Sequence, residues 1–435
     1  MFVPEPEIGT QSKEAIKAFQ ETRLGEILSY VNKNSKFYST LFKEKGIDVS
    51  QIKTIEDLEK LPVTTKEHLQ QQNMDFLCVD KSKIIDYMTT SGTSGEPVTF
   101  GATENDLERL ALNEYMSFVC AGGSPDDIYH LIVTLDRRFM AGLAYYIGLR
   151  KLGASIVRVG PGNPELQFDT IKRIKPTVFV TVPSFLIKMI EYAEENKIDY
   201  KNSSIKSAIC IGEPIRDTNF NLNKLGQQIT SKWDIKLFST YASTEMSGAF
   251  TECTEGKGGH LHAELMIVEF LDSNNKPVKE GELGEVTITT LGVEGMPLIR
   301  FKTGDICTYD SSPCKCGRNT LRISPVVGRK NQMIKYKGTS LFPPSLYDIL
   351  NDMPGVKNYI IEVSTNSIDT DDILVKVGCE TPDEIFEKNI KDHFRAKLRV
   401  APSIQFLNPD EIAILQFPGM SRKPVTFIDK RISKY

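Results

Sequence analysis

Long hydrophobic runs are absent from this chain of 435 residues, and their absence excludes a class of protein. No stretch approaches the roughly eighteen consecutive apolar residues that a membrane-spanning helix needs. The first residues, 1–7, have neither a basic start nor an apolar run, so no signal peptide is expected. The sequence therefore predicts a cytoplasmic protein without a membrane partner.

An excess of basic charge is also missing. The 53 Lys and Arg residues against 57 Asp and Glu residues give a net charge of −4, with a pI near 5.9. This balance argues against general nucleic-acid binding, so a polyphosphate ligand would need local donors or a metal. The composition, 40% hydrophobic and 25% charged, is typical of a globular protein, and the length predicts two or more domains.

Disulfides are not expected among the eight cysteines, because they are rare in the cytoplasm. Five cysteines lie singly in apolar surroundings and are interpreted as small buried hydrophobes: Cys78, Cys120, Cys210, Cys307 and Cys379. The other three are considered below with a nearby histidine.

Helical patterns alternate with short, almost continuously apolar segments from about residue 104. Helices are predicted at 104–121, 140–152, 165–174 and 185–195, and strands at 128–133, 155–159, 178–182, 208–211 and 236–239. Nearer the N-terminus, residues 12–34 and 54–72 also look helical, with one polar face. Such alternation is typical of an α/β fold with a parallel sheet covered by helices on both faces. Ligands of such folds bind at the carboxyl ends of the strands, where residues 212–214 and 241–245 are expected.

The pattern changes after residue 262. Short strands at 268–271, 284–289 and 306–309, separated by turns, predict a small antiparallel β subdomain over about 262–327. From residue 328 a compact α+β unit is predicted, with helices near 344–351 and 383–398 and strands near 359–363 and 373–377. We therefore expect a large N-terminal domain, 1–327, and a small C-terminal domain, 328–435.

A loop rich in hydroxyl groups and glycine lies at residues 89–97, where five Ser or Thr and two Gly fill seven consecutive positions. Such a loop can place backbone and hydroxyl donors around an anion, although a flexible turn is an equally ordinary outcome. It is not a Walker loop, because GxxxxGK[ST] is absent and Glu96 stands where a lysine is usual. Its flanks, 84–88 and 98–100, predict that it joins two strands.

A second candidate site combines Cys253, His260, Cys314 and Cys316. Two thiolates two residues apart, followed by Gly317, can turn onto one ion, and Cys₃His is a common closed structural zinc site. The alternative is three buried reduced cysteines with His260 on a surface loop. His262 is expected to point elsewhere, and no ligand position is left for water, which indicates a structural role.

Several segments along the chain together resemble a known family. They are the loop at 89–97, Gly212-Glu213-Pro214, Tyr241-x-Ser243-Thr244-Glu245, Arg300-x-x-Thr303-Gly304-Asp305, Gly328-Arg329 and a late lysine, Lys423. In order and spacing they resemble the adenylate-forming superfamily of acyl-CoA synthetases, luciferases and peptide-synthetase adenylation domains. Within it the chain looks most like phenylacetate–coenzyme A ligases, which also show similar Cys…His…CxC positions. The resemblance covers essentially the whole chain from about residue 20.

The resemblance implies a two-step reaction that uses ATP, Mg²⁺ and coenzyme A. A carboxylate attacks the α-phosphorus of ATP to give an acyl-adenylate and pyrophosphate, and the coenzyme A thiol then displaces AMP. Such chemistry depends on positioning and charge stabilisation more than on a covalent nucleophile. No Ser-His-Asp arrangement is apparent in the sequence, and none is required.

The resemblance also implies roles for single residues. The first loop would donate to the β- and γ-phosphates, Tyr241 would stack on adenine, Thr244 would contact the α-phosphate, and Glu245 would hold Mg²⁺. Lys423 would contact the reacting carboxylate and α-phosphate, Asp305 the ribose hydroxyls, and Arg329 the ribose or phosphate. The implied nucleotide-binding residues are Ser91, Gly92, Thr93, Ser94, Gly95, Gly212, Glu213, Pro214, Tyr241, Ala242, Ser243, Asp305 and Arg329. Ordinary alternatives remain: a solvated acid for Glu245, a turn former for Asp305, a core ring for Tyr241 and an exposed lysine for Lys423.

The family's small C-terminal domain is mobile, and Asn331 occupies the hinge position where Asp or Lys is usual. Glu96 and Pro424 are two further departures from the family pattern. The expected activity is ligation of an aryl acid to coenzyme A, with residues 137–146 forming the acyl pocket and a homodimer possible. Two alternatives are a stand-alone enzyme that loads a carrier protein and a nucleotide-binding homologue with impaired catalysis.

Overall fold

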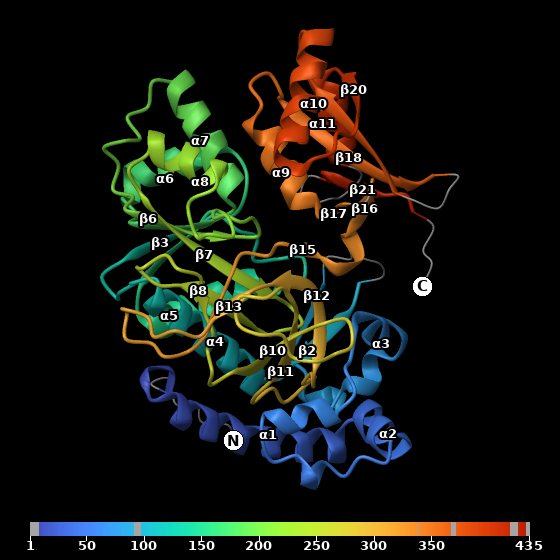
Figure 1. The fold of residues 1–435 in the computed structure, drawn as a ribbon. Helices are drawn as coiled ribbons and strands as arrows, with labels where there is room; N and C mark the ends of the chain where they lie inside the picture. The colour runs from blue at the N-terminus through green and yellow to red at the C-terminus, as the bar shows by residue number, and fades with distance from the viewer. Residues whose placement is uncertain (1–7, 91–96, 338, 367–370, 418–424, 432–435) are drawn as a thin grey trace. The chain divides into compact units, whose positions relative to one another are not determined.

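The chain, represented here by a computed structural model, forms two compact units (Figure 1). The first comprises residues 1–303 and 307–325, and the second comprises residues 304–306 and 326–435. The structure describes residues 8–90, 97–337, 339–366, 371–417 and 425–431.

A nine-stranded sheet forms the centre of the first unit, in the order β13-β14-β9-β8-β7-β6-β5-β3-β4. Its strands are β3 (Ile128–Leu131), β4 (Ser155–Arg158), β5 (Val178–Thr181), β6 (Ser207–Ile211), β7 (Lys236–Ser243), β8 (Gly248–Glu252), β9 (Gly259–His260), β13 (Tyr309–Asp310) and β14 (Arg322–Ile323). The strands from β4 to β7 pair in parallel, which confirms the predicted α/β class. From β7 onwards the pairs are antiparallel, so the sheet is mixed.

Helices cover both faces of the parallel part. They are α4 (Glu104–Cys120), α5 (Met140–Leu152), α6 (Pro164–Ile174), α7 (Pro183–Glu195) and α8 (Lys224–Lys232). Phe179 of β5 belongs to the apolar cluster that α6, α7 and Trp233 complete. Its neighbour Val180 belongs to a second cluster, with Phe118 of α4 and Leu149 of α5. Because successive side chains of a strand point to opposite faces, the two clusters lie on the two sides of the sheet.

The first loop joins two strands, as predicted. β1 (Asp86–Thr89) and β2 (Thr99–Ala102) form an antiparallel hairpin in which Thr89 lies opposite Thr99. Thr90 N donates to Val98 O at 3.0 Å and Val98 N to Thr90 Oγ1 at 3.0 Å, which closes the base of the loop. Residues 91–96 lie outside the described part of the chain.

A smaller sheet holds β10 (Met266–Leu271), β11 (Gly284–Thr290) and β12 (Phe301–Cys307) side by side. β10 and β11 pair antiparallel, as expected for the β subdomain. Residue 309, assigned to this region from the sequence, instead begins β13 in the large sheet. The reason is that β14 pairs with both β13 and β9.

Three helices lie near the N-terminus: α1 (Lys13–Asn34), α2 (Lys36–Glu44) and α3 (Lys66–Gln71). The continuous helix predicted over 54–72 is broken, because a 3₁₀ turn at Glu56–Lys60 ends before Leu61 and Thr64 bridges to Phe301 in extended conformation. Further 3₁₀ turns are Ile8–Thr10, Val49–Gln51, Asn73–Phe76, Lys81–Lys83 and Lys330–Gln332. None of the helices in the described ranges combines the length and apolar character that crossing a membrane requires.

The second unit has its own core around the sheet β20-β19-β18-β21. Its strands are β15 (Gly328–Arg329), β16 (Ile334–Tyr336), β17 (Thr339–Leu341), β18 (Asn358–Thr365), β19 (Asp371–Gly378), β20 (Ser403–Leu407) and β21 (Phe427–Asp429), and its helices are α9 (Pro343–Asp352), α10 (Glu384–Leu398) and α11 (Pro409–Gln416). Residues 304–306 of β12 belong to this unit, and Asp305 and Ile306 pair antiparallel with β15. The sequence predicted α9, α10, β18 and β19 but not the short elements that follow them.

Candidate functional site

The segment Tyr241–Glu245 projects past the end of a neighbouring strand. β6 ends at Ile211, which lies opposite Thr240, so β7 continues beyond it and pairs with β8. Tyr241, Ala242 and Ser243 therefore lie within β7, whereas the sequence placed them after a strand. Thr244 and Glu245 lie in the turn that leads to β8. The segment still reaches the carboxyl-end edge of the parallel sheet, where ligands of such folds bind.

The turn after β7 is held by polar contacts. Ser243 Oγ accepts from Met246 N at 3.3 Å, and Ser247 N donates to Thr244 O at 3.2 Å. Ser247 has φ +46°, and its carbonyl accepts from Arg109 Nη1. Arg109 also donates to two other backbone carbonyls at 2.6 Å, and burial lowers its pKa to about 10, still well above neutral. A buried guanidinium thus fixes the turn, a role for which the sequence carries no signal.

Tyr241 lies partly exposed on the sheet edge. Its ring centroid is 5.8 Å from that of Phe250, with the planes at 31°, because the two residues are cross-strand partners. Phe250 is fully buried, so Tyr241 rests on the core and leaves part of its ring to solvent.

The loop Gly212-Glu213-Pro214 follows β6, next to β7. Gly212 has φ +75°, in the left-handed region that favours glycine. The Glu213 carboxylate accepts from Ser184 N at 2.9 Å and from Ser184 Oγ at 3.0 Å. Ser184 lies in the first turn of α7, where an anion is favourable, so Glu213 fastens this loop to the helix.

Glu245 lies beside a lysine from a distant part of the sequence. Lys66 Nζ is 3.9 Å from Glu245 Oε1, and the exposed fractions of the two side chains are 22% and 13%. Sequence reasoning did not find Lys66.

Asp305 and Arg329 meet within the second unit. They are register partners of β12 and β15, and Arg329 Nε donates to Asp305 Oδ1 at 3.1 Å. The Asp305 side chain is 10% exposed and that of Arg329 is 44% exposed. Two residues proposed for the same ribose are thus adjacent. The residues Ser91, Gly92, Thr93, Ser94, Gly95 and Lys423 lie outside the described residues.

Four candidate metal ligands converge as the spacing predicted. The ligand atoms of Cys253, His260, Cys314 and Cys316 all lie within 4.8 Å of one another. Cys253 Sγ is 3.7 Å from Cys314 Sγ, and Cys316 Sγ is 3.5 Å from His260 Nε2. Tetrahedral zinc with Zn–S bonds of about 2.3 Å and Zn–N bonds of about 2.05 Å separates two sulfurs by roughly 3.8 Å and sulfur from nitrogen by roughly 3.6 Å. The four side chains therefore fit this ion.

Neighbouring groups favour the ligand forms of His260 and Cys316, whereas burial raises the pKa of the Cys253 thiol well above its ordinary value. His260 Nδ1 lies 3.3 Å from Thr320 Oγ1, which orients the ring with Nε2 towards the cluster, and burial lowers its pKa to about 4. Burial alone would raise the pKa of the Cys316 thiol, but hydrogen bonds, including one from Arg318, bring it below its ordinary value. Gly317, with φ +89°, donates its N–H to Cys314 O at 3.0 Å and closes the knuckle.

The structure also bears on the predictions for His262 and for the five remaining cysteines. His262 Nε2 lies 3.1 Å from Ser117 Oγ of α4, outside the four-ligand group. The five cysteines interpreted as buried hydrophobes are all buried. One of them, Cys120, also packs against Cys253 and Cys314, a contact that its sequence neighbours do not indicate.

The segment expected to form the acyl pocket begins α5. Met140 and Tyr145 point into apolar clusters of the core, and Tyr145 packs edge-on against Phe118 at 6.2 Å. Phe139 and Ala141 are partly exposed. Of these four apolar residues of the segment, Phe139 and Ala141 remain accessible.

Comparison with known proteins places these features in a family. The family model described as "AMP-binding enzyme" matches residues 19–295. A phenylacetate–coenzyme A ligase of Thermus thermophilus is 28% identical over 383 residues, which cover 87% of this chain and 84% of the relative. One of Aromatoleum evansii is 27% identical over 401 residues, covering 91% and 87%. The crystal structure of a 2-hydroxyisobutyryl-CoA ligase in the postadenylation state matches the fold with a TM-score of 0.83 at 24% identity, covering 98% of this chain and 92% of the other.

Proposed function

Because this chain belongs to the AMP-binding enzyme family and is an ATP-dependent acid–thiol ligase, we propose that its acid is an aryl carboxylic acid of the phenylacetate type. The reaction joins this acid to coenzyme A through an acyl-adenylate. The observation that carries the proposal is the fixed turn after β7, which carries Thr244 and Glu245 and follows a strand that pairs with β6, the strand before the glycine loop at 212–214. The names of the relatives support the choice of acid.

Within this proposal, the β6–β7 edge binds the nucleotide. Tyr241 stacks on adenine with the face of its ring that does not contact Phe250. The backbone of 212–214, rather than the Glu213 side chain, contacts the same adenine, because the Glu213 carboxylate already binds Ser184. Thr244 donates to the α-phosphate. Glu245 holds Mg²⁺, a hard cation that takes carboxylate oxygens and neutralises developing phosphate charge.

The second unit supplies the ribose contacts and the late lysine. Asp305 accepts from the ribose hydroxyls while its ion pair with Arg329 keeps both side chains in place. Lys423 contacts the carboxylate and α-phosphate during adenylation. Rotation of this unit about Asn331 then presents a different face for the thioester step.

The cluster of Cys253, His260, Cys314 and Cys316 holds a structural zinc ion. The sulfur–sulfur distance of 3.7 Å and the orientation of His260 by Thr320 support this assignment. A closed set of four protein ligands leaves no position for a reacting water, so the ion contributes stability rather than chemistry.

The test is a screen of aryl and fatty acids for acid-dependent ATP–pyrophosphate exchange, followed by thioester formation. We expect exchange with an aryl acid and a thioester with free coenzyme A. Exchange without free thioester would instead support the loading of a carrier protein. Nucleotide binding without exchange on any acid would support an impaired homologue and contradict the proposed reaction. Cytoplasmic localisation and a homodimer remain predictions.

A further inference from the structure

Lys66 is a cation that the N-terminal segment brings to the turn carrying Glu245. It is the first residue of α3, and its side chain is 22% exposed. Its ammonium lies 3.9 Å from Glu245 Oε1. This separation exceeds the roughly 2.7–2.9 Å of a charge-assisted hydrogen bond, so the two groups are near each other without being closed into one contact.

The position of Lys66 is not explained by the stability of its helix. A cation in the first turn of a helix gains nothing from the helix dipole, which favours anions there. A partly exposed ion pair contributes little to folding, typically under about 1 kcal/mol. A buried pair in the same unit contrasts with it: Lys302 Nζ is 2.7 Å from Glu285 Oε2, and both side chains are less than a tenth exposed. A residue that breaks a local preference without a stability gain points to function.

The backbone before Lys66 is pinned to the start of β12. Thr64 is fully buried and forms a parallel bridge to Phe301. Thr64 N donates to Arg300 O at 2.9 Å, Lys302 N donates to Thr64 O at 2.8 Å, and Thr64 Oγ1 donates to Ile299 O at 2.8 Å. Two residues after this anchor, the chain has little freedom to carry Lys66 elsewhere.

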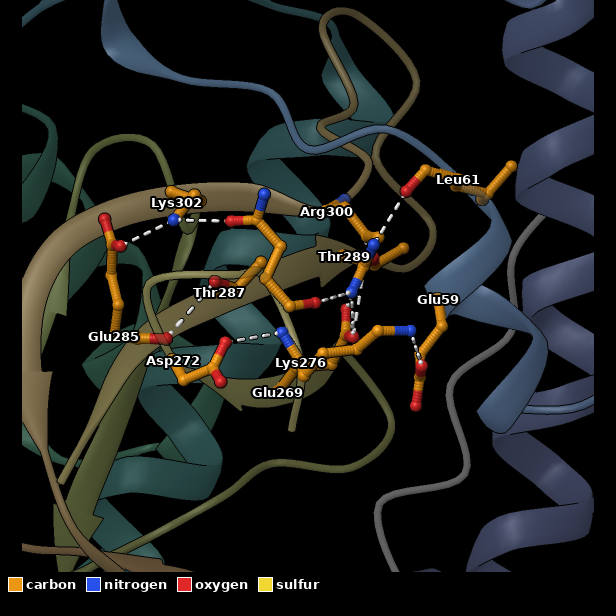
Figure 2. A network of polar contacts seen from close by, with 11 residues as sticks. Glu59, Leu61, Glu269, Asp272, Lys276, Glu285, Thr287, Thr289, Arg300 and Lys302 are labelled. Atoms are coloured by element: carbon orange, nitrogen blue, oxygen red, sulfur yellow. Dashed lines mark hydrogen bonds and ion pairs between the residues drawn. The ribbon is translucent and has the colours of Figure 1, made fainter. Parts of the chain in front are cut away.

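A buried polar network holds the same segment from its other end (Figure 2). Arg300 Nη1 donates to Leu61 O at 2.7 Å, while its Nε and Nη2 bind the Glu269 carboxylate at 3.0 and 2.9 Å. The Arg300 side chain is 2% exposed, and its backbone has φ +46°. Residues 61–64 are therefore fixed at both ends, so the backbone from which the Lys66 side chain extends towards Glu245 is held in place.

From these contacts we propose that Lys66 binds the β- and γ-phosphates of ATP and stabilises the pyrophosphate leaving group. The proposal rests on the proposed function, in which Glu245 holds Mg²⁺ at the same turn. During adenylation a carboxylate oxygen bonds to the α-phosphorus, and the bond from that phosphorus to the bridging oxygen breaks. The electron pair stays on pyrophosphate, whose additional negative charge a neighbouring ammonium stabilises.

The sequence gives an independent reason for a cation from outside the hydroxyl-rich loop. Residues 89–97 contain no lysine or arginine and carry Glu96, so that loop offers hydroxyl and amide donors but no positive side chain. The net charge of the chain is −4, which provides no general attraction for a polyanion. Lys66 supplies the missing charge from a separate segment.

The test compares nucleotide affinities by calorimetry in the presence of Mg²⁺. Lys66→Met keeps the length of the side chain and removes its charge, so we expect the dissociation constant for ATP to rise on the order of ten-fold and that for AMP to change less than about two-fold. Lys60→Met is the matched control, because Lys60 is 63% exposed and pairs with Asp57, and it should alter neither affinity. Lys66→Arg should retain most of the ATP affinity.

Each outcome of this comparison supports or contradicts the role of Lys66 in ATP binding. Equal losses of ATP and AMP affinity, or an unchanged ATP affinity, would overturn the role of Lys66. Lys66→Gln serves in the same way if the methionine variant misfolds. A wild-type protein that binds ATP but makes no thioester with any acid would sink the proposed function and leave the affinity comparison valid. A wild-type protein that binds no ATP would overturn both.

Discussion

Glu245 lies on a turn whose backbone is held by the hydrogen bond from Arg109 to the Ser247 carbonyl. The turn therefore keeps its shape when the charge of Glu245 is removed. Glu245→Gln retains size and hydrogen-bonding capacity but not the charge that Mg²⁺ requires, so we expect pyrophosphate exchange to fall by two or more orders of magnitude with an unchanged melting temperature.

The control is Glu195→Gln, which removes an exposed carboxylate at the end of α7. It should leave exchange at the wild-type rate. Near-wild-type exchange in the Glu245 variant would remove this residue from the reaction, whereas a large drop in melting temperature would indicate a structural role.

The buried carboxyl group of Glu114 should make the stability of the protein depend on pH. Burial raises the pKa of its carboxyl from 4.5 to about 8. The folded state then holds a proton that the unfolded state loses, so stability falls as pH rises from about 4.5 to about 8 and levels off above, by up to about 1.4 kcal/mol per pH unit.

Glu114→Gln removes this titration while keeping the shape of the side chain. Buried Glu264, whose pKa is raised to about 7, and the buried histidines titrate alike in both proteins, so we expect the stability of the variant relative to the wild type to increase between pH 5 and pH 8. A difference between the two melting temperatures that does not change with pH would contradict the assignment of a neutral Glu114.

At the scale of elements, α4 and α5 approach each other closely at Gly148. A Cβ atom added there would lie 2.2 Å from Glu114 Cβ, which forces the helices apart. We expect Gly148→Ala to destabilise the protein by about 1–3 kcal/mol. Gly25→Ala in α1 is the matched control: nothing lies within 4 Å of its added Cβ, and helix propensity predicts a gain of up to about 1 kcal/mol. Opposite signs of the two changes in denaturant melts would support this packing, and equal effects would not.

The four-ligand cluster joins segments that are far apart along the chain, because His260 lies in β9 and the 314–316 knuckle lies between β13 and β14. Removing one thiolate opens the site and costs folding energy. Cys314→Ser should lower zinc content from about one equivalent and the melting temperature together, while folded protein keeps its affinity for ATP. Cys379→Ser, a buried thiol of the second unit, should leave the zinc content unchanged. Wild-type protein that is fully stable and active without metal would contradict the zinc site and support three ordinary reduced cysteines beside His260.

At the scale of the whole molecule, assays of adenylation and of thioester formation can be run separately, and they test whether Lys423 serves only the first. Lys423→Ala should abolish pyrophosphate exchange yet still convert supplied acyl-adenylate to acyl-CoA, because the lysine serves only the first step. Single-turnover assays of each half-reaction measure this. Equal losses in both would contradict either the alternation of the small unit or the choice of lysine.

Local patterns predicted much of the molecule, since hydrophobic periodicity and turn-forming residues act over only a few residues of sequence. The helix at 140–152, the strand–loop–strand around 89–97 and the four candidate metal ligands follow from such patterns. What the sequence missed depends on contacts across long separations. β7 extends through Ser243 because β8 pairs with it, and the helix expected over 54–72 breaks because Thr64 bridges to Phe301. Arg109 and Lys66 have no motif of their own, and only the folded chain brings them to the turn.

The three residues of β12 that belong to the second unit have a consequence for gene fusion. Ile306 accepts the backbone N–H of Val327, and Asp305 pairs with Arg329, so the second unit uses a strand encoded upstream of residue 328. A chimera spliced at 328 would inherit one side of this pairing from each parent. We expect such exchanges between relatives to succeed only when the donor also supplies residues 304–306, or when both parents agree there.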